Sequence, residues 1–421
     1  MVVEKGYKQT EVGVIPEDWQ LLKILEIAEF KKELFDDGDW IESEYIVNKG
    51  IRLIQTGNIG IGKYLEKGNK KYISHSSFIK LKCKELRLGD LLICRLAEPA
   101  GRACILKNIE DQKIITSVDV SIFRPDEHKY NREFLNQFFT SKQWLESVSE
   151  NSGGTTHKRI SRGTLGKLFA PIPPLPEQTA IANALSDMDA LIAQTEKFIE
   201  KKKAIKQGVM QELLKPKEGW VTKKLGEVGK CLRGVSYNPE IDLHKFPDST
   251  NFSLLRSNNI FEGLLELNNL QFVNKMKVKD FQVVKDSDII ICMANGSKQL
   301  VGKSAIADNI EKNRYTYGAF MGCFRTFDSY NPKFVFSLMQ SKNFRNYIDI
   351  LLSGSSINNL NPSNIESISF AFPDLITQNE IAEIIDAYSK ELESLNLKLQ
   401  KLKLQKQGMM QALLTGKIRL I

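Results

Sequence analysis

Cysteine and histidine are scarce in this sequence, and their scarcity argues against several kinds of site. The 421 residues include six cysteines and four histidines. The cysteines are dispersed and form no Cys-x-x-Cys pair, which argues against a zinc site and a disulfide framework. We predict that all six are small buried side chains in a reducing compartment. The histidines lie far apart, so a histidine-based catalytic triad has no local support.

Long hydrophobic runs are also missing. No uncharged run reaches the roughly 18 residues that a membrane-spanning helix needs. The N-terminal stretch MVVEKGYKQTEVG lacks the apolar segment of a signal peptide, so we expect a cytoplasmic protein. The composition is 42% hydrophobic and 26% charged, which is typical of a globular protein. The length predicts two to three domains, and the net charge of +8 favours a polyanionic partner.

The chain is internally duplicated. KQGVMQELL at 206–214 returns as KQGMMQALL at 406–414, and LGDLLIC at 88–94 returns as DSDIIIC at 286–292. These offsets of about 200 residues predict two homologous halves. The short β-rich runs bounded by turn residues read as buried strands, and other stretches have helical spacing. We therefore predict an α/β (α+β) fold for the globular part of each half.

The last part of each half predicts a long helix with an apolar seam. Mostly apolar residues recur at alternating steps of four and three, as in a coiled coil, and the polar exceptions are Thr195, Lys202, Lys206 and Lys406. The seam residues are Ile181, Leu185, Met188, Ile192, Thr195, Ile199, Lys202, Lys206, Val209 and Leu213, and then Ile381, Ile385, Tyr388, Leu392, Leu395, Leu399, Leu402, Lys406, Met409 and Leu413. Each helix would hold about 38 residues and span about 57 Å. Duplicated copies related by a pseudo-twofold axis would pair antiparallel; two unrelated core helices are the alternative.

A glycine lies inside each of these predicted helices. Gly208 and Gly408 occupy matching places in the repeated KQG phrase. Glycine there costs up to about 1 kcal/mol relative to alanine. We predict that each allows another backbone to approach closely, from a globular part or a partner subunit, and a local helix break is the alternative.

Motifs for catalysis are near misses. GNIGIGKY (57–64) resembles a phosphate-binding loop but ends in tyrosine instead of serine or threonine. GSKQLVGKS (296–304) has five residues between its glycines instead of four. NPKF (331–334) departs from the adenine-methyltransferase motif at its third position. Turn formation explains all three.

Polar loops give a better indication of function. TTHKR (155–159) in the first half lies opposite SSINN (355–359) in the second, so matched loops differ while their surroundings agree. Arg, Lys, Asn and Gln side chains suit base edges and phosphates, although any single loop is also compatible with a solvated turn. The candidate DNA-binding residues are Gln55, Asn58, Lys63, Arg95, Arg102, Thr155, Thr156, His157, Lys158, Arg159, Arg162, Arg256, Asn258, Asn259, Lys298, Gln299, Lys303, Ser355, Ser356, Asn358 and Asn359.

With these features the sequence resembles the specificity (S) subunits of type I restriction–modification systems. The resemblance covers nearly the whole chain and rests on KQTEVGVIPEDW (8–19), PLPEQTAIANALSDMDALI (174–192), the repeated KQG phrase and LLTGKIRL (413–420). PDLITQNEIAEII (373–385) departs from the proline-rich helix entry of the first half.

The resemblance implies a domain plan and a set of partners. The plan is an arm (1–17), target recognition domain 1 (18–175), spacer helix 1 (176–216), target recognition domain 2 (217–374), spacer helix 2 (375–415) and a tail (416–421). Each recognition domain would read one half of a bipartite double-stranded DNA target. Two methyltransferase (M) subunits and restriction (R) motor-nuclease subunits would be the protein partners. S-adenosylmethionine, ATP and magnesium would belong to those partners, and this chain would bind no cofactor and be non-catalytic alone.

Two other interpretations stay open at this point. The chain could be a stand-alone DNA methyltransferase or nuclease with cryptic motifs. It could also be a coiled-coil scaffold that binds only proteins. Activity of the isolated chain would favour the first, and absence of salt-dependent DNA affinity would favour the second.

Overall fold

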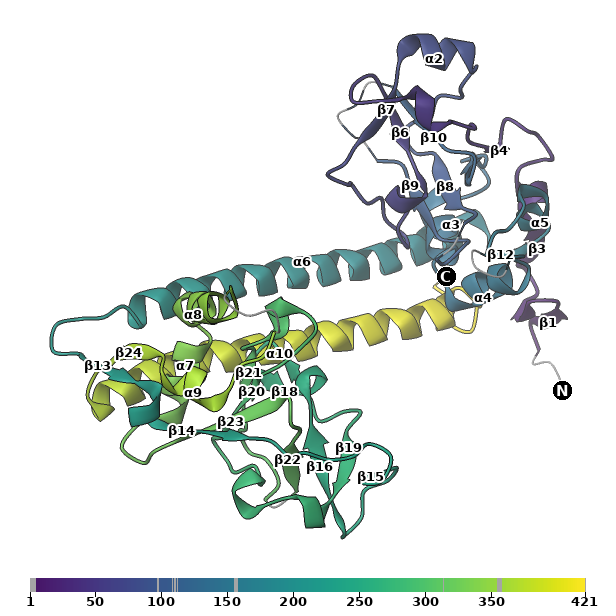
Figure 1. Ribbon diagram of the computed structural model, residues 1–421. Helices are drawn as coiled ribbons and strands as arrows, with labels where there is room; N and C mark the ends of the chain where they lie inside the picture. The colour runs from purple at the N-terminus through teal and green to yellow at the C-terminus, as the bar shows by residue number, and fades with distance from the viewer. Residues whose placement is uncertain are drawn as a thin grey trace. The chain divides into compact units, whose positions relative to one another are not determined.

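The chain folds into two compact units in the computed structural model. The structure describes residues 5–96, 98–107, 109, 111, 113–154, 158–312, 314–353 and 358–420. The first unit comprises residues 1–196 and 398–421, and the second comprises residues 197–397. Each unit contains a globular part and a portion of each of the two long helices, α6 (Leu175–Leu213) and α10 (Leu375–Leu413), which are the teal and yellow helices of Figure 1.

The first unit contains two four-stranded sheets, one of order β10-β6-β7-β5 and one of order β4-β11-β8-β9. Their strands are β4 (Phe35–Asp37), β5 (Ile46–Val47), β6 (Ile51–Ile54), β7 (Lys71–Ile73), β8 (Leu91–Cys94), β9 (Ala103–Ile105), β10 (Ile114–Thr116) and β11 (Val120–Phe123). A hairpin, β1 (Tyr7–Thr10) with β2 (Gly13–Pro16), and a pair, β3 (Gln20–Lys23) with β12 (Phe169–Ile172), complete the strands. The short helices are α1 (Ile24–Ile27), α2 (His75–Lys80), α3 (Arg132–Phe138), α4 (Lys142–Glu150) and α5 (Arg162–Gly166).

The second unit repeats this plan with the same strand orders. Its sheets are β22-β16-β19-β15 and β14-β23-β20-β21. The strands are β13 (Val221–Lys224), β14 (Gly229–Arg233), β15 (Leu243–His244), β16 (Asn251–Leu255), β17 (Ile260–Phe261), β18 (Leu264–Leu265), β19 (Gln271–Asn274), β20 (Ile289–Cys292), β21 (Ser304–Ile306), β22 (Tyr315–Tyr317), β23 (Met321–Thr326) and β24 (Ser369–Phe372). The short helices are α7 (Pro332–Met339), α8 (Lys342–Ser353) and α9 (Pro362–Glu366). The predicted α/β fold and internal repeat are confirmed.

The repeat extends to individual hydrogen bonds at the start of each long helix. The buried Gln178 side chain accepts from the Asn131 backbone N–H (2.8 Å) and donates to the Pro173 carbonyl (2.9 Å). Gln378 makes the same two bonds in the second unit, at 3.0 and 2.9 Å. A buried amide that satisfies two backbone groups is costly to replace, so each glutamine joins a long helix to its own globular part.

In the first unit, a buried carboxylate joins the two ends of the chain. Glu177 is fully buried and accepts the Trp19 indole N–H at 2.9 Å. Arg419 donates to both Glu177 oxygens, at 2.6 and 2.8 Å, and also to the Asp18 carboxylate. Hydrogen bonding to the two carboxylates, that of Glu177 above all, raises the pKa of Arg419. The C-terminal segment therefore packs against the N-terminal segment.

The seam of the long helices is confirmed within each unit, and the pairing is antiparallel. In the first unit, Asp189 and Glu196 of α6 pair with Lys406 and Lys403 of α10, at 2.6 and 2.7 Å, so the partner numbers fall as α6 advances. In the second unit, Lys202 pairs with Glu391 at 2.7 Å. Further along α6, Met210 shares a core with Ile381 and Ile385, again at lower α10 numbers. The seam residues of both helices are buried or half-buried.

The glycine prediction is wrong as far as the globular parts are concerned. Gly208 and Gly408 are exposed, and no atom of the described residues lies within 4 Å of a Cβ built at either one. The helices also continue through both positions without a break. Close approach by a partner subunit stays a prediction. In a separate finding, none of the helices in the described part of the chain is long and apolar enough to span a bilayer.

Cysteine chemistry gives a first test of this fold. All six cysteines are free and buried. Burial raises the pKa of Cys83 to about 11 and those of Cys104 and Cys231 to about 12, so the reactive thiolate is depleted at neutral pH. At pH 8 we expect iodoacetamide to leave the native thiols unmodified while it labels all six in urea, as measured by mass spectrometry. Rapid labelling of the native chain would contradict the described core.

Candidate nucleic-acid interface

Three chain segments meet beside the sheets of the first unit, and we call them the loop frame. They are residues 39–41 after β4, 55–58 after β6, and 117–119 between β10 and β11. The Asp39 N–H donates to the Thr116 carbonyl (2.9 Å), and the Ser117 N–H donates to the Ile54 carbonyl (3.1 Å). These backbone bonds hold the three segments together whatever side chains they carry.

The second unit contains the same frame. Its segments are 235–239, 256–259 and 318–320. The Val235 N–H donates to the Tyr317 carbonyl (2.8 Å), and the Gly318 N–H donates to the Leu255 carbonyl (3.1 Å). The two units therefore present matched loops on matched backbone at this frame. The loops matched in the sequence, 155–159 and 355–359, lie largely outside the described residues.

A glycine makes each frame possible. A Cβ at Gly38 would lie 2.3 Å from the Ser117 carbonyl oxygen, and one at Gly234 would lie 2.0 Å from the Gly318 carbonyl oxygen. Carbon and oxygen cannot approach so closely without displacing backbone. Both positions therefore need glycine because of the close approach of two chain segments.

An asparagine braces each frame from inside. The Asn58 side chain accepts from the Gln55 N–H (3.0 Å) and donates to the Leu65 carbonyl (2.9 Å). Asn259 accepts from the Arg256 N–H (3.0 Å) and donates to the Glu266 carbonyl (2.9 Å) in the second unit. Both asparagines are buried. They were candidates for base contacts, but their amides are used within the chain, so we assign them a structural role.

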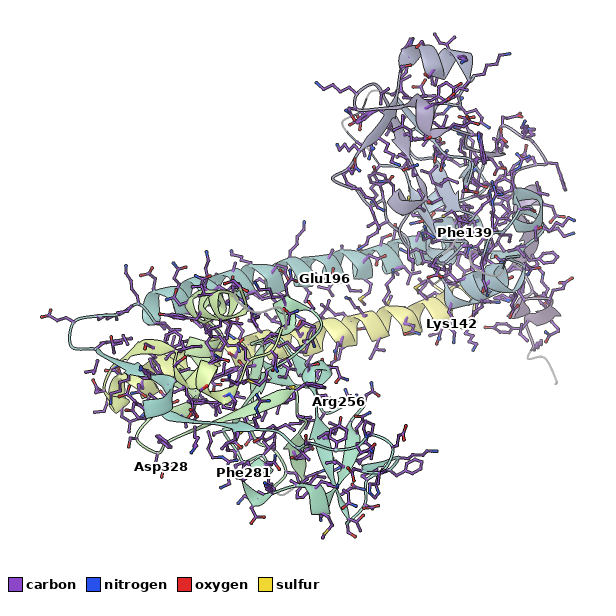
Figure 2. The ribbon with its side chains drawn as sticks, viewed as in Figure 1. Phe139, Lys142, Glu196, Arg256, Phe281 and Asp328 are labelled. Atoms are coloured by element: carbon purple, nitrogen blue, oxygen red, sulfur yellow. The ribbon has the colours of Figure 1, made fainter. Side chains whose placement is uncertain are left out.

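Each frame borders a cavity, and the walls of the first are the more polar of the two. The first cavity has a volume of about 450 Å³ and the second about 1070 Å³. The side chains with hydrogen-bonding groups on their walls include Gln55, Lys67, Asn69 and Lys71 in the first, and Arg256, Asn258, Asn295 and Asn358 in the second. Arg256 is labelled among the side chains of the second unit in Figure 2. Of the predicted DNA-binding residues, the structure gathers Gln55 and Asn58 at one cavity and Arg256, Asn258 and Asn358 at the other.

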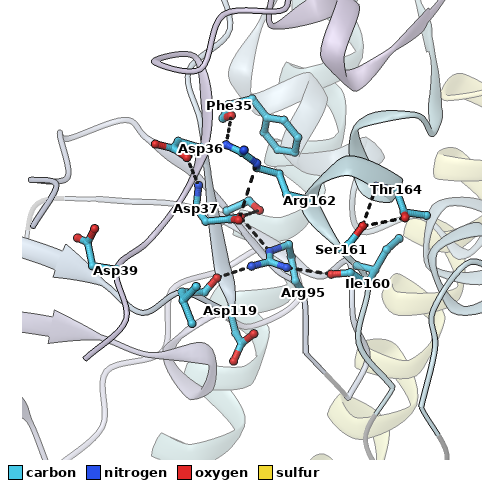
Figure 3. Close-up of polar contacts among 12 residues, drawn as sticks. Phe35, Asp36, Asp37, Asp39, Arg95, Asp119, Ile160, Ser161, Arg162 and Thr164 are labelled. Carbon is cyan, nitrogen blue, oxygen red and sulfur yellow. Dashed lines mark hydrogen bonds and ion pairs between the residues drawn. The ribbon is translucent and has the colours of Figure 1, made fainter. Parts of the chain in front are cut away.

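Two of the arginines predicted in the first unit, Arg95 and Arg162, lie in an ion-pair network beside its frame (Figure 3). Arg95 is buried, pairs with Asp37 at 3.0 Å and donates to the Ile160 carbonyl at 3.0 Å. Arg162 donates to Asp36 at 2.6 Å. The guanidinium of Arg95 is therefore held within the protein.

Arg159 differs from Arg95 because it is exposed. Its guanidinium lies 2.7 Å from Asp119, which belongs to the frame and lines the first cavity. A half-exposed ion pair of this kind holds the side chain weakly. Of the arginines in this network, Arg159 is the one best placed to reach a ligand at the cavity.

The second unit keeps the backbone of this network and replaces its side chains. The Arg95 N–H donates to the Asp119 carbonyl at 2.8 Å, and the Met293 N–H donates to the Phe320 carbonyl at 2.9 Å. An isolated β-bridge joins Leu96 to Arg159 in the first unit, and the equivalent bridge joins Ala294 to Asn359 in the second. On equivalent backbone, Met293, Phe320 and Asn359 thus replace Arg95, Asp119 and Arg159. The exposed Arg233 takes the place of Asp37. Such variation is what two readers of different sequences need.

The other predicted residues fall into three groups. Arg102 is buried and donates to the carbonyls of Ile59, Thr56 and Pro99 at 2.6 to 2.9 Å, so its donors are used within the chain. Lys63, Lys158, Lys298 and Gln299 are exposed, and Lys303 is half-buried. Thr155, Thr156, His157, Ser355 and Ser356 lie outside the described residues.

Sequence reasoning missed the acidic side of the network. Asp36, Asp37 and Asp119 hold the arginines in place. The acidic run in FDDGDW was the available signal. Its role depends on contacts between segments more than 50 residues apart, which no local pattern reveals.

Comparison with known proteins identifies the family of the chain. The family described as type I restriction modification DNA specificity domain matches twice, at residues 16–207 and 217–404. The chain therefore belongs to this family, with one copy in each half. We call the globular part of each unit a recognition domain from here on.

Individual relatives agree with this assignment. The StySPI specificity subunit of Salmonella potsdam is 34% identical over 185 residues, which are 44% of this chain and 39% of that protein. The EcoKI specificity subunit of Escherichia coli K12 is 32% identical over 48% of this chain and 43% of that protein. Each match thus spans less than half of the relative. The putative MjaX specificity subunit of Methanocaldococcus jannaschii is 25% identical over 99% of this chain and 97% of its own length.

Solved structures agree on the fold. The S subunit of a type I restriction–modification system from M. genitalium has a TM-score of 0.56 at 15% identity, over 98% of both chains. A second structure, from work on complex assembly of the type I system, also has a TM-score of 0.56, at 14% identity, over 96% of this chain and 99% of that one.

The glycines of the two frames give a second test. We expect Gly38→Ala to lower the free energy of unfolding by about 2 kcal/mol, since the added methyl group must displace backbone. Gly234→Ala should have a similar effect. Gly68→Ala and Gly296→Ala are the matched controls, because a Cβ there meets no atom within 4 Å. Chemical denaturation measures all four, and equal costs for tests and controls would contradict the close approach.

Proposed function

We propose that this chain is the sequence-reading subunit of a type I restriction–modification complex, in which each recognition domain reads one half of a bipartite double-stranded DNA target. One observation carries the proposal. The two recognition domains share a backbone frame down to individual hydrogen bonds, whereas the side chains on that frame differ. Conserved geometry with altered hydrogen-bonding groups supports the reading of two different half-sites.

The proposal extends to partners and cofactors. Two methyltransferase (M) subunits would dock on this chain and bring S-adenosylmethionine, and restriction (R) subunits would bring ATP and magnesium. The target adenines would leave the base stack to enter the methyltransferase sites. The chain itself would bind no cofactor and catalyse no reaction alone. A chain that acts on chromosomal DNA in this way would act in the cytoplasm.

Methylation mapping tests the proposed function directly. A host that carries this chain with its M subunits should show adenine methylation at a single bipartite sequence in long-read sequencing. The isolated chain with S-adenosylmethionine and plasmid should show none. Methylation by the isolated chain would favour a stand-alone enzyme. A complex without salt-dependent DNA affinity would favour a protein-only scaffold.

We further propose that the paired helices set the distance between the half-sites. Deleting residues 190–196 of α6 together with residues 399–405 of α10 removes seven residues from each helix. The two segments face each other in the antiparallel pair, since Asp189 pairs with Lys406 and Glu196 with Lys403. Removing a whole heptad preserves the seam.

This double deletion shortens each helix by about 10 Å. At 3.4 Å per base pair, the unspecific spacer of the methylated target should become about three base pairs shorter. Methylation sequencing of a host with the deleted chain measures the spacer. A methylated target with the original spacer would show that the helices do not set the distance.

A further inference from the structure

Each recognition domain carries one large aromatic side chain that is exposed on a cavity wall. Trp40 is 68% exposed and lines the first cavity, and Phe320 is 72% exposed and lines the second. By contrast, Trp19 and Trp144 are almost completely buried in the core of the first unit. Trp40 and Phe320 therefore contribute little to the core, and their place on a cavity wall distinguishes them from other exposed aromatics such as Phe30 and Phe246.

The two aromatics do not occupy equivalent positions. Trp40 follows Gly38 by two residues, as Ser236 follows Gly234. Phe320 lies in the turn between β22 and β23, where the first domain has Asp119. The fold thus tolerates a small polar residue at the first position and an acid at the second. An aromatic ring has been placed once beside each cavity, by a different loop each time.

The surroundings of each ring suit the bases of duplex DNA. A ring exposed beside amide and cationic groups offers an apolar face for a base or for the thymine methyl group. Gln55 and Asn69 beside Trp40, and Arg256 and Asn258 beside Phe320, offer hydrogen-bonding groups for base edges. Aromatic wedges and stacking platforms are common where proteins deform or unstack nucleic acids.

We propose that Trp40 and Phe320 are specificity-determining residues, each of which packs against the bases of one half-site. The hydrogen-bonding side chains of the adjacent cavity read the edges of those bases. This inference rests on the proposed DNA-reading function and adds to it the particular loop that makes the apolar contact in each domain. Because the aromatic changes loop between the domains, the two half-sites receive it in different places.

Half-site mutagenesis tests the proposal in the complex with M subunits. The dissociation constant is measured for the methylation target and for duplexes in which one half-site is scrambled. The preference for a half-site is the ratio of the dissociation constants for the scrambled and the intact duplex. Trp40→Ala should reduce at least tenfold the preference for the half-site that the first domain reads. It should leave the preference for the other half-site unchanged. Phe320→Ala should do the reverse. The matched controls are Phe30→Ala and Phe246→Ala, which should change neither preference. Phe30 is 73% exposed and Phe246 is 76% exposed, and neither lines a cavity wall.

Several outcomes would overturn the inference. Unchanged preferences in both alanine variants, or an equal loss at both half-sites, would show that the rings do not read bases. A wild-type complex without any sequence preference would overturn the proposed function and this inference with it. Trp40→Phe should retain most of the preference, because a ring remains. Thermal unfolding temperatures equal to that of the wild type show that the variants fold.

Fluorescence offers a readout that a structural role would not move. The chain has four tryptophans, of which Trp19 and Trp144 are buried and Trp220 is half-buried. Among these four tryptophans, acrylamide should quench mainly Trp40. Target DNA should protect this emission, and DNA with a scrambled first half-site should protect it much less. Equal protection by both duplexes would contradict a base contact by Trp40.

Discussion

The close backbone contact at Gly38, and at Gly234 in the second unit, is the constraint on which both recognition domains depend. Because neither residue has a Cβ, its backbone lies directly against a turn between two strands. That turn is 117–119 in the first unit and 318–320 in the second. Backbone hydrogen bonds then join that turn to a third segment. None of these contacts involves the side chains that point outward. The loops can therefore exchange charge, amide and aromatic groups without loss of the frame.

A second set of contacts joins each recognition domain to its part of the helix pair. Gln178 and Gln378 use their amides to satisfy backbone groups beside the helix starts. In the first unit, Glu177 adds bonds to Trp19 and Arg419, and so connects the beginning of the chain with its end. The proposed spacing function requires that each recognition domain is held rigidly on its helix. A flexible connection would let the distance between the half-sites vary.

Sequence reasoning predicted the architecture better than the candidate site. The duplication, the buried strands and the two seams follow from periodicity, which depends on residue type at regular spacing. The candidate site depends on which polar groups remain free after folding. Asn58, Asn259, Arg95 and Arg102 have the right chemistry for DNA, yet their donors are held by carbonyls and carboxylates of the same chain. A list of residue types cannot distinguish a donor used internally from one that is available.

The sequence by itself therefore determined the two halves, their α/β character, and the pair of long helices, because hydrophobic periodicity and repetition are properties of residue order. It also pointed to DNA as the partner, through polar loops that differ on matched surroundings. Only the tertiary structure decided which of those polar residues brace the frame and which border a cavity. It alone brought Trp40 and Phe320 to the cavity walls, since burial and contact are set by segments distant in the chain.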